Sequence, residues 1–294
     1  MILLTGATGL VGSLLLRSLL DSGEQVRCLV RDPRRLGPNR VRVQITLGEL
    51  EDPKSLRQAV RGVDTVVHLA SSIRDQHAAS IEELNGLATI RLLRDAERAG
   101  VERFIYFSAL CATPSSRTRF FRAKSQAEQA VLESEIETLV FAPSIVYAPG
   151  DPWLTLLGRM MYLPWMPIAG EGRTRFQPIW AEDVVSCVTA VLSPERQNGK
   201  RRLELAGPDV LTYEEIVELA LEADGRRRPV VHLPLGLVRR GLRTLERLVG
   251  PSVFATWEEV ELLEEPMTTA RGTEDARELG VDPKPMREVL GIVG

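Results

Sequence analysis

The sequence has few of the residues that cross-link a chain or bind metals. Its 294 residues include three cysteines and three histidines. The cysteines are scattered and odd in number, which argues against a disulfide framework or a paired zinc motif and indicates free thiols in a reducing compartment. Neither His77 nor His232 has a cysteine or carboxylate neighbour at ligand spacing, so we predict no metal site. The three cysteines are Cys28, Cys111 and Cys187.

Long apolar runs and a strong charge imbalance are also absent. No apolar run approaches the roughly 18 residues that a membrane-spanning helix requires. The formal net charge is −3, which gives no reason to expect a nucleic acid partner. A cleaved signal peptide would remove the apolar strand and the glycines that begin the chain, so we expect a cytoplasmic protein. The length suits one large domain or a core domain with a smaller appendage.

The first twelve residues carry the clearest motif. A short apolar run over residues 2–5 leads into three glycines at three-residue spacing, and residues 13–20 have the pattern of a helix. Such glycines permit a tight turn, close approach of a pyrophosphate and close packing of helix on strand, and the N–H groups at the helix start hold the phosphates. Glycines also mark ordinary turns, but the strand–turn–helix context favours a dinucleotide site. The candidate phosphate-binding residues are Gly6, Thr8, Gly9, Leu10, Val11 and Gly12.

Strand and helix patterns alternate through the first half of the chain and then break at about residue 152. This order predicts a doubly wound parallel α/β sheet covered on both faces, with ligands beyond the carboxyl ends of its strands. We therefore expect an NAD(P)-binding Rossmann domain over residues 1–150. Residues 151–294 should form a small, mostly helical C-terminal cap interleaved with that core. The predicted strands are 25–30, 65–70, 101–108 and 138–143, and the predicted helices include 54–60, 82–99, 124–134, 182–192 and 212–223.

The order of these landmarks resembles the short-chain dehydrogenase/reductase superfamily, in its extended or atypical branch. That branch includes epimerase/dehydratase-like enzymes, NmrA-like redox sensors and the NADPH-binding accessory subunit of respiratory complex I. The matching segments are 5–12, 48–50, 64–70, 146–151 and 177–183, with Asn85, Ser108 and Lys124 at three further positions. The resemblance implies further cofactor contacts from Glu49, Leu50, Ala70, Ser71, Asn85, Lys124 and Pro143.

One position departs from the family pattern. Four residues before Lys124 stands Phe120, where the family has its catalytic tyrosine. That tyrosine is a general acid or base, and losing such a group typically costs about 10²–10⁴-fold in rate. The departure resembles atypical members that bind NADPH without demonstrated turnover, whereas relatives of isoflavone reductase keep the lysine and work without the tyrosine. Tyr106, Thr118 and Tyr147 are the candidates to replace the missing phenol, and for Tyr106 we favour a place in the core over a role as the replacement acid.

The cofactor preference depends on the end of the second predicted strand. NAD-preferring proteins place an acidic residue there for the ribose hydroxyls, but this chain has Arg31. An arginine can pair with a 2′-phosphate through its planar guanidinium. Asp32 could serve NAD(H) instead, so both cofactors stay open, and we favour NADP(H).

Two functions from different classes fit these residues. In the first, the protein is an oxidoreductase or isomerase acting on a small organic or nucleotide-sugar-like substrate, and its substrate is unknown. The resemblance then implies that Ser108 orients the reacting oxygen and that Lys124 or a bound water handles the proton. In the second, the protein is a non-catalytic NADPH-binding scaffold, redox sensor or assembly factor. The resemblance also makes a homodimer through the helices that flank Lys124 plausible.

Residues 235–249 form one more pattern, an apolar stripe opposite a basic face. Such a helix can lie on an anionic membrane or on a protein partner. A helix packed into the core with a solvated basic face is the commoner explanation, and we favour it. The stripe is Val238, Leu242, Leu245, Leu248 and Val249, and the basic face is Arg239, Arg240, Arg243 and Arg247.

Overall fold

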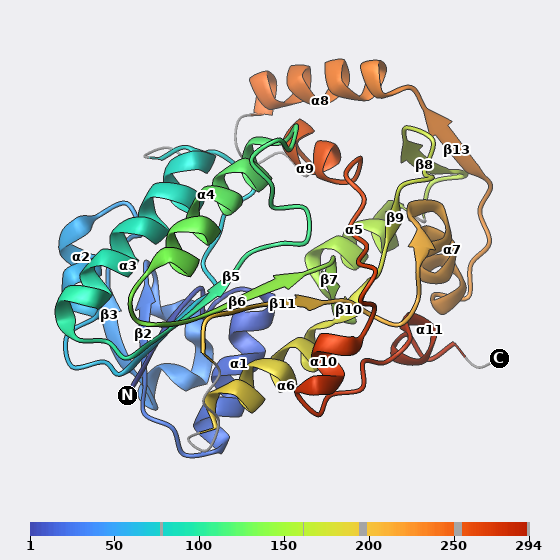
Figure 1. Cartoon of the computed structure of the whole chain (residues 1–294). Coiled ribbons are helices and arrows are strands. Elements are labelled where there is room, and N and C mark those ends of the chain that lie inside the picture. The colour runs from blue at the N-terminus through green and yellow to red at the C-terminus, as the bar shows by residue number, and fades with distance from the viewer. Residues whose placement is uncertain (77–78, 161, 194–198, 250–254, 293–294) are drawn as a thin grey trace.

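A seven-stranded parallel sheet forms the centre of the molecule (Figure 1). The computed structural model describes residues 1–76, 79–160, 162–193, 199–249 and 255–292; His77 and the side chains of Pro152 and Val249 lie outside this description. The strand order is β11-β6-β5-β4-β1-β2-β3, and every neighbouring pair is parallel. The strands are β1 (Ile2–Thr5), β2 (Val26–Val30), β3 (Gln44–Leu47), β4 (Thr65–His68), β5 (Arg103–Phe107), β6 (Glu137–Pro143) and β11 (Arg201–Leu205).

Helices cover both faces of this sheet, which confirms the doubly wound α/β fold. Side chains alternate between faces along a strand, so the buried Leu3 and Leu4 of β1 enter different cores. Leu4 packs with helices α1 (Leu10–Asp21) and α6 (Ala181–Leu192). Leu3 packs on the other face with helices that precede β4, β5 and β6. These are α2 (Pro53–Ala59), α3 (Ala88–Ala99) and α4 (Arg119–Glu133).

Two helices of the first half of the chain are irregular. The 3-10 helix η1 (Pro33–Val41) follows β2, and the π-helix η2 (Glu83–Leu87) runs directly into α3. The single helix expected over residues 82–99 is therefore wider at its start than an α-helix. Such π-turns are uncommon and often lie beside functional sites.

The chain after residue 150 serves both the core and the cap. Strand β11 forms one edge of the sheet, and helices α6 and α10 (Glu274–Glu278) contribute to the core on its α1 face. Most of the other elements lie beyond the carboxyl ends of the strands (Figure 1). Short strands pair there as β7 with β10, β8 with β13, and β9 with β12. The strands are β7 (Val146–Tyr147), β8 (Met166–Ala169), β9 (Arg175–Phe176), β10 (Ile179–Trp180), β12 (Leu211–Thr212) and β13 (Val230–Leu233). The helices are α5 (Pro152–Met160), α7 (Tyr213–Ala223), α8 (Leu235–Val249), α9 (Trp257–Leu262), α10 (Glu274–Glu278) and α11 (Met286–Val289).

Helix α8 differs from its prediction. We favoured a helix packed into the core, but no described side chain of α8 is buried. The helix lies along the outer edge of the cap and packs against α9 (Figure 1). In the part of the chain that the structure describes, no helix has the length and apolar character of a membrane span.

Candidate functional site

The three glycines of the N-terminal motif differ in what a side chain at each position would meet. Gly6 has φ +75, and a Cβ there would lie 2.6 Å from the backbone N of Ala70. A Cβ on Gly12 would lie 2.1 Å from the carbonyl O of Gly6. Both glycines are therefore required by the chain itself. A Cβ on Gly9 would meet Gly6 O at an ordinary 3.4 Å, so only a ligand would need glycine at this exposed position.

The start of α1 is built to receive an anion. Gly9 is the N-cap, and it provides no side-chain hydrogen bond. The first turn, which includes Leu10, Val11 and Gly12, contains no acidic residue. The first N–H groups of a helix lack intrahelical partners, and the helix dipole makes this end positive. The cradle of glycines and free N–H groups thus fits the pyrophosphate of a dinucleotide.

A buried chain of hydrogen bonds fixes β1, β4 and α3 behind this cradle. The N–H of Ala70 donates to Thr5 Oγ1 at 3.3 Å, and Thr5 Oγ1 lies 2.6 Å from His68 Nδ1. His68 Nε2 lies 2.9 Å from Thr89 Oγ1, which donates to the carbonyl O of Asn85 at 2.9 Å. Because Thr89 donates onward, it accepts from Nε2–H, and Thr5 donates to Nδ1. Burial, and then the Lys124 charge, lowers the pKa of His68 to about 3, so the ring is neutral.

Asn85 holds the segment that leaves β4. Its Oδ1 accepts from the N–H of Ser72 at 3.0 Å, and its Nδ2 donates to the carbonyls of Ser72 and Ile81 at 2.7 and 2.8 Å. The amide is therefore occupied by main-chain groups. Because Asn85 lies in η2, the π-turn and the path of residues 69–76 are fixed together.

Residues 69–76, which we call the β4 strap, cross the end of β1. The strap begins after β4, yet Gln76 accepts a hydrogen bond from Arg31 at the end of β2. Since β1 lies between β4 and β2 in the sheet, the strap passes over the carboxyl edge where the glycine cradle lies. The cap holds the strap as well, because Arg74 donates to Glu259 of α9 at 2.8 and 2.9 Å.

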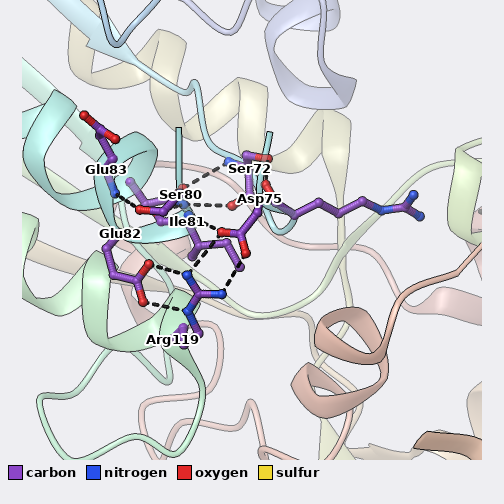
Figure 2. A network of polar contacts seen from close by, with 9 residues as sticks. Ser72, Asp75, Ser80, Ile81, Glu82, Glu83 and Arg119 are labelled. Carbon is purple, nitrogen blue, oxygen red and sulfur yellow. Dashed lines mark hydrogen bonds and ion pairs between the residues drawn. The ribbon is translucent and has the colours of Figure 1, made fainter. Parts of the chain in front are cut away.

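Figure 2 shows a third tie on the strap, made by Arg119 at the start of α4. Its guanidinium donates to Glu82 at 2.7 and 2.6 Å and to Asp75 at 2.8 and 3.1 Å. These bonds lower the pKa of Glu82 to about 2 and also lower the pKa of Asp75. Asp75 accepts a further bond from the N–H of Ile81 at 2.8 Å.

The charged residues that we expected to discriminate between cofactors lie after the carboxyl ends of β2 and β3. Arg31 is exposed, and within the described ranges no carboxylate lies in ion-pair range of it. Asp32 instead accepts the N–H of Arg34 at 2.9 Å as the N-cap of η1. Glu49 is exposed just after β3, and Leu50 is half-buried against the core.

The other end of the site contains Lys124 and Ser108. Lys124 is 3% exposed, and its Nζ donates to the carbonyl O of Phe107. That carbonyl belongs to the peptide bond that joins Phe107 to Ser108, so the structure brings Lys124 and Ser108 together. Ser108 Oγ is buried and has no hydrogen-bond partner in the described part of the chain. Nζ lies 5.7 Å from the centre of the Phe120 ring and 5.0 Å from that of Tyr106.

Burial changes the acid–base character of Lys124. Loss of hydration lowers its pKa to about 7, and the nearby Glu128 carboxylate opposes that shift. A buried amine that titrates near neutrality can give or take a proton at physiological pH.

The three candidates to replace the missing phenol lie in different surroundings. Tyr106 lies in the core under α3 and α4, and burial raises its pKa. Thr118 is the N-cap of α4 and accepts the N–H of Phe121. Tyr147 lies in the apolar cluster that also contains Phe120, and its hydroxyl has no partner among the described residues. Of the three candidates, Tyr147 is thus the one that shares a cluster with Phe120, the position of the family's proton donor.

Three further predicted residues lie at the carboxyl edge of the sheet. Ser71 is exposed on the strap, Ala70 is half-buried against Gly6, and Pro143 is buried at the end of β6. No sequence pattern indicated the hydrogen bonds that Gln76, Asp75 and Glu259 make with distant arginines. Arg74 and Glu259 are 185 positions apart, so no local pattern could pair them.

The fold and this edge define an NAD(P)-binding protein, and the comparisons with known proteins agree. An NAD(P)H-binding family model matches residues 6–148. A ceramide reductase from Caulobacter vibrioides is 30% identical over 275 residues, covering 88% of this chain and 83% of the relative. The chain belongs to the short-chain dehydrogenase/reductase superfamily, in its extended or atypical branch.

Other relatives are named for different roles. A mitochondrial NADH dehydrogenase 1 alpha subcomplex subunit 9 from Arabidopsis thaliana is 28% identical over 246 residues, and the match spans 80% of this chain but 60% of that protein. Among solved structures, UDP-glucose 4-epimerase from Thermotoga maritima has a TM-score of 0.75 at 18% identity, covering 98% of this chain and 96% of that one. The crystal structure of gox2253 has a TM-score of 0.74 at 24% identity, covering 99% of this chain and 95% of that one. These structures support the fold alone.

Proposed function

We propose that this protein is an NADP(H)-dependent oxidoreductase that acts on an apolar organic substrate and uses Lys124 in place of the missing tyrosine. The observation that carries the proposal is the buried Lys124 ammonium beside Ser108, with its pKa lowered to about 7. A bound nicotinamide would supply or accept the hydride at this end of the site. Phe120 has no proton to give, so the proton in a reduction would come from Lys124 directly or through one water.

The roles of the neighbouring side chains follow from their contacts. Ser108 has a buried hydroxyl without a partner, which can donate to a substrate oxygen. The Phe107 carbonyl accepts from Lys124 and aims the amine at the Ser108 peptide. Phe120 keeps water from the amine and so maintains its lowered pKa.

The surroundings of Phe120 favour an apolar substrate over a nucleotide sugar. The side chains clustered with Phe120 include Cys111, Ile145, Trp153 and Leu263, all half-buried. A nucleotide diphosphate needs several cationic partners, whereas an apolar molecule gains by covering such side chains. Two relatives point the same way by name, the ceramide reductase and a sterol demethylase protein B from Methylococcus capsulatus, which is 28% identical over 265 residues.

The charges at the adenosine end support NADP(H) over NAD(H). Arg31 makes its contact with a neutral amide, which a 2′-phosphate can replace with a stronger, charge-assisted bond. Asp32 is engaged with the backbone of η1. We expect Arg31→Ala to weaken NADPH binding and to leave NADH binding unchanged in isothermal titration.

Lys124→Met and the pH dependence of turnover test the proton donor. With NADPH and a series of aliphatic methyl ketones, the reduction rate should be highest where Lys124 is protonated and fall as pH rises through about 7. Lys124→Met should lower kcat by about 10²–10⁴-fold, and Phe120→Tyr should raise it. The matched control is Lys54→Met, which removes an exposed lysine on α2. A protein that is loaded with NADPH and reduces none of the ketones, even as Phe120→Tyr, would contradict the proposal.

A second candidate is a scaffold or assembly factor that holds the dinucleotide permanently. The β4 strap favours it, since ties to β2, α4 and α9 hold the strap over the cradle. Relatives named as a complex I subunit and as the photosystem II assembly factor Ycf39 support it by name. Mass spectrometry of nucleotide released on denaturation, before and after long dialysis, separates the two. Retained NADPH supports the scaffold, and ready exchange supports the enzyme.

A further inference from the structure

Helix α8 has an apolar side that the rest of the described chain leaves partly uncovered. Its inner stripe is only half-buried, and Leu237 and Leu248 are 62% and 79% exposed. A helix that packs into a core has its apolar stripe fully buried. Figure 1 shows α8 as the outermost element of the cap, with α9 beneath it. The half-buried stripe residues are Leu235, Val238, Leu242 and Leu245.

The opposite side of α8 is strongly basic. It carries four arginines and one glutamate, in a chain whose formal net charge is −3. The glutamate, Glu246, accepts the N–H of Trp257 at 3.2 Å, and Arg239 lies over the Trp257 ring at 5.3 Å. In the described part of the chain, no carboxylate lies within ion-pair range of the other three arginines. Those three are Arg240, Arg243 and Arg247.

We propose that α8 docks this protein on an anionic lipid surface. The exposed Leu237 and Leu248 would lie at the boundary between headgroups and acyl chains, and the arginines would contact lipid phosphates. The charge pattern favours lipid over a second copy as the occupant, because a symmetric partner would present the same basic helix and supply no anionic groups for the four arginines of α8. An anionic bilayer supplies both an apolar phase and negative charge over the full length of the helix.

Docking through α8 would place the apolar cluster around Phe120 near the surface. Helix α9 packs against α8, and its Leu262 belongs to that cluster. The same helix holds the β4 strap through Glu259. The docking proposal does not depend on the oxidoreductase proposal, since it rests on the exposure and charge of α8 alone.

Vesicle co-sedimentation of the full chain tests the docking. The probes are vesicles of phosphatidylcholine alone and vesicles with about one-third phosphatidylglycerol. We expect binding to the anionic vesicles only, and weaker binding as salt rises because screening shortens the range of the charges. No pelleting with anionic vesicles at low salt would overturn the proposal.

Charge reversal on two helices separates docking from general attraction. Each basic residue at an anionic surface is worth about a fivefold gain in partitioning, so Arg243→Glu with Arg247→Glu should lower binding by at least about 25-fold. Both side chains are exposed, and thermal unfolding should show an unchanged fold. The matched control reverses the exposed Arg57 and Arg61 beside α2 and should keep full binding. An equal loss in both variants would overturn the proposal.

The apolar side has its own variant. Leu237→Ser with Leu248→Ser keeps every charge and removes the two most exposed leucines of α8. Binding should fall, most clearly at high salt, where the electrostatic part is screened. Sedimentation velocity tests the alternative of a second copy. If the wild-type chain does not bind vesicles but forms a dimer, and this variant is monomeric, then α8 binds a second copy and the membrane proposal is overturned.

Discussion

Helices α3 and α8 have the same kind of amphipathic pattern and opposite environments. In α3, Leu92, Leu93 and Ala96 are buried under the sheet, and Arg94 and Arg98 face outward. In α8 the apolar stripe is half-buried at best. The cause lies in what each helix connects. Helix α3 joins β4 to β5, neighbouring parallel strands, so it must lie across the sheet, whereas α8 follows β13 of a two-stranded pair.

Segregation of apolar and basic residues therefore determines which side of a helix is apolar, but not what covers that side. A sheet of seven strands has enough apolar surface to bury α3 completely. The pair of β8 and β13, with the short helix α9, does not cover a helix of fifteen residues. The apolar side of α8 is therefore available to something outside the described chain.

Truncation of one leucine in α3 and one in α8 should give the largest difference in the loss of unfolding free energy. Leu92→Ala removes a fully buried side chain and should lower the free energy of unfolding by about 2–5 kcal/mol. Leu242→Ala, in the half-buried stripe of α8, should cost less than about 1 kcal/mol. Urea unfolding followed by circular dichroism measures both. Equal costs would mean that α8 is as much a part of the core as α3.

Substitution of Gly12 and of Gly9 by alanine should give a smaller difference in unfolding free energy. Gly12→Ala places a Cβ 2.1 Å from Gly6 O, which must displace the loop and cost about 1–3 kcal/mol. Gly9→Ala meets only ordinary contacts and should change stability by less than about 1 kcal/mol, yet it should weaken dinucleotide binding. Unfolding and NADPH titration of both variants measure this. Full NADPH binding by Gly9→Ala would show that the dinucleotide does not approach that residue.

The sequence predicted the parts of this molecule that depend on local patterns. Glycine spacing located the cradle, and the alternation of strands and helices predicted the parallel sheet. The family resemblance assigned Ser108 and Lys124 to one site. In the structure, Lys124 Nζ donates to the carbonyl O of Phe107, whose peptide bond leads to Ser108. The lysine pKa could not be predicted, because it depends on burial by Phe120, Tyr106 and the core around them.

Long-range contacts could not be predicted from the sequence, and the ties of the β4 strap to β2, α4 and α9 depend on such contacts. No pattern links Arg31 to Gln76, or Arg119 to Asp75, since each pair is brought together only when the chain has folded. The half-burial of α8 was missed for the same reason. The sequence pattern of α8 is that of an ordinary core helix. Its half-burial is seen only in the structure, where the short helix α9 is the element packed against it.

We expect the smallest effect on stability when the ion pairs of Arg119 with Asp75 and Glu82 are broken; we call these three residues the clamp. Arg119, Asp75 and Glu82 are each more than one-third exposed, so Arg119→Met should cost less than about 1 kcal/mol at pH 7. Its matched control is Arg173→Met, which breaks an open surface pair with Glu171.

The pH dependence of that small cost identifies its source. The pKa of Glu82 is lowered from 4.5 to about 2 in the folded chain, so its contribution is present above about pH 4.5 and disappears as pH falls toward 2. Wild type and Arg119→Met should therefore differ in unfolding free energy at pH 7 and converge at low pH. If the strap covers the dinucleotide, the variant should also release NADPH faster than Arg173→Met in a stopped-flow chase. A release rate equal to that of the control would mean that the clamp stabilises the strap without controlling access to the cradle.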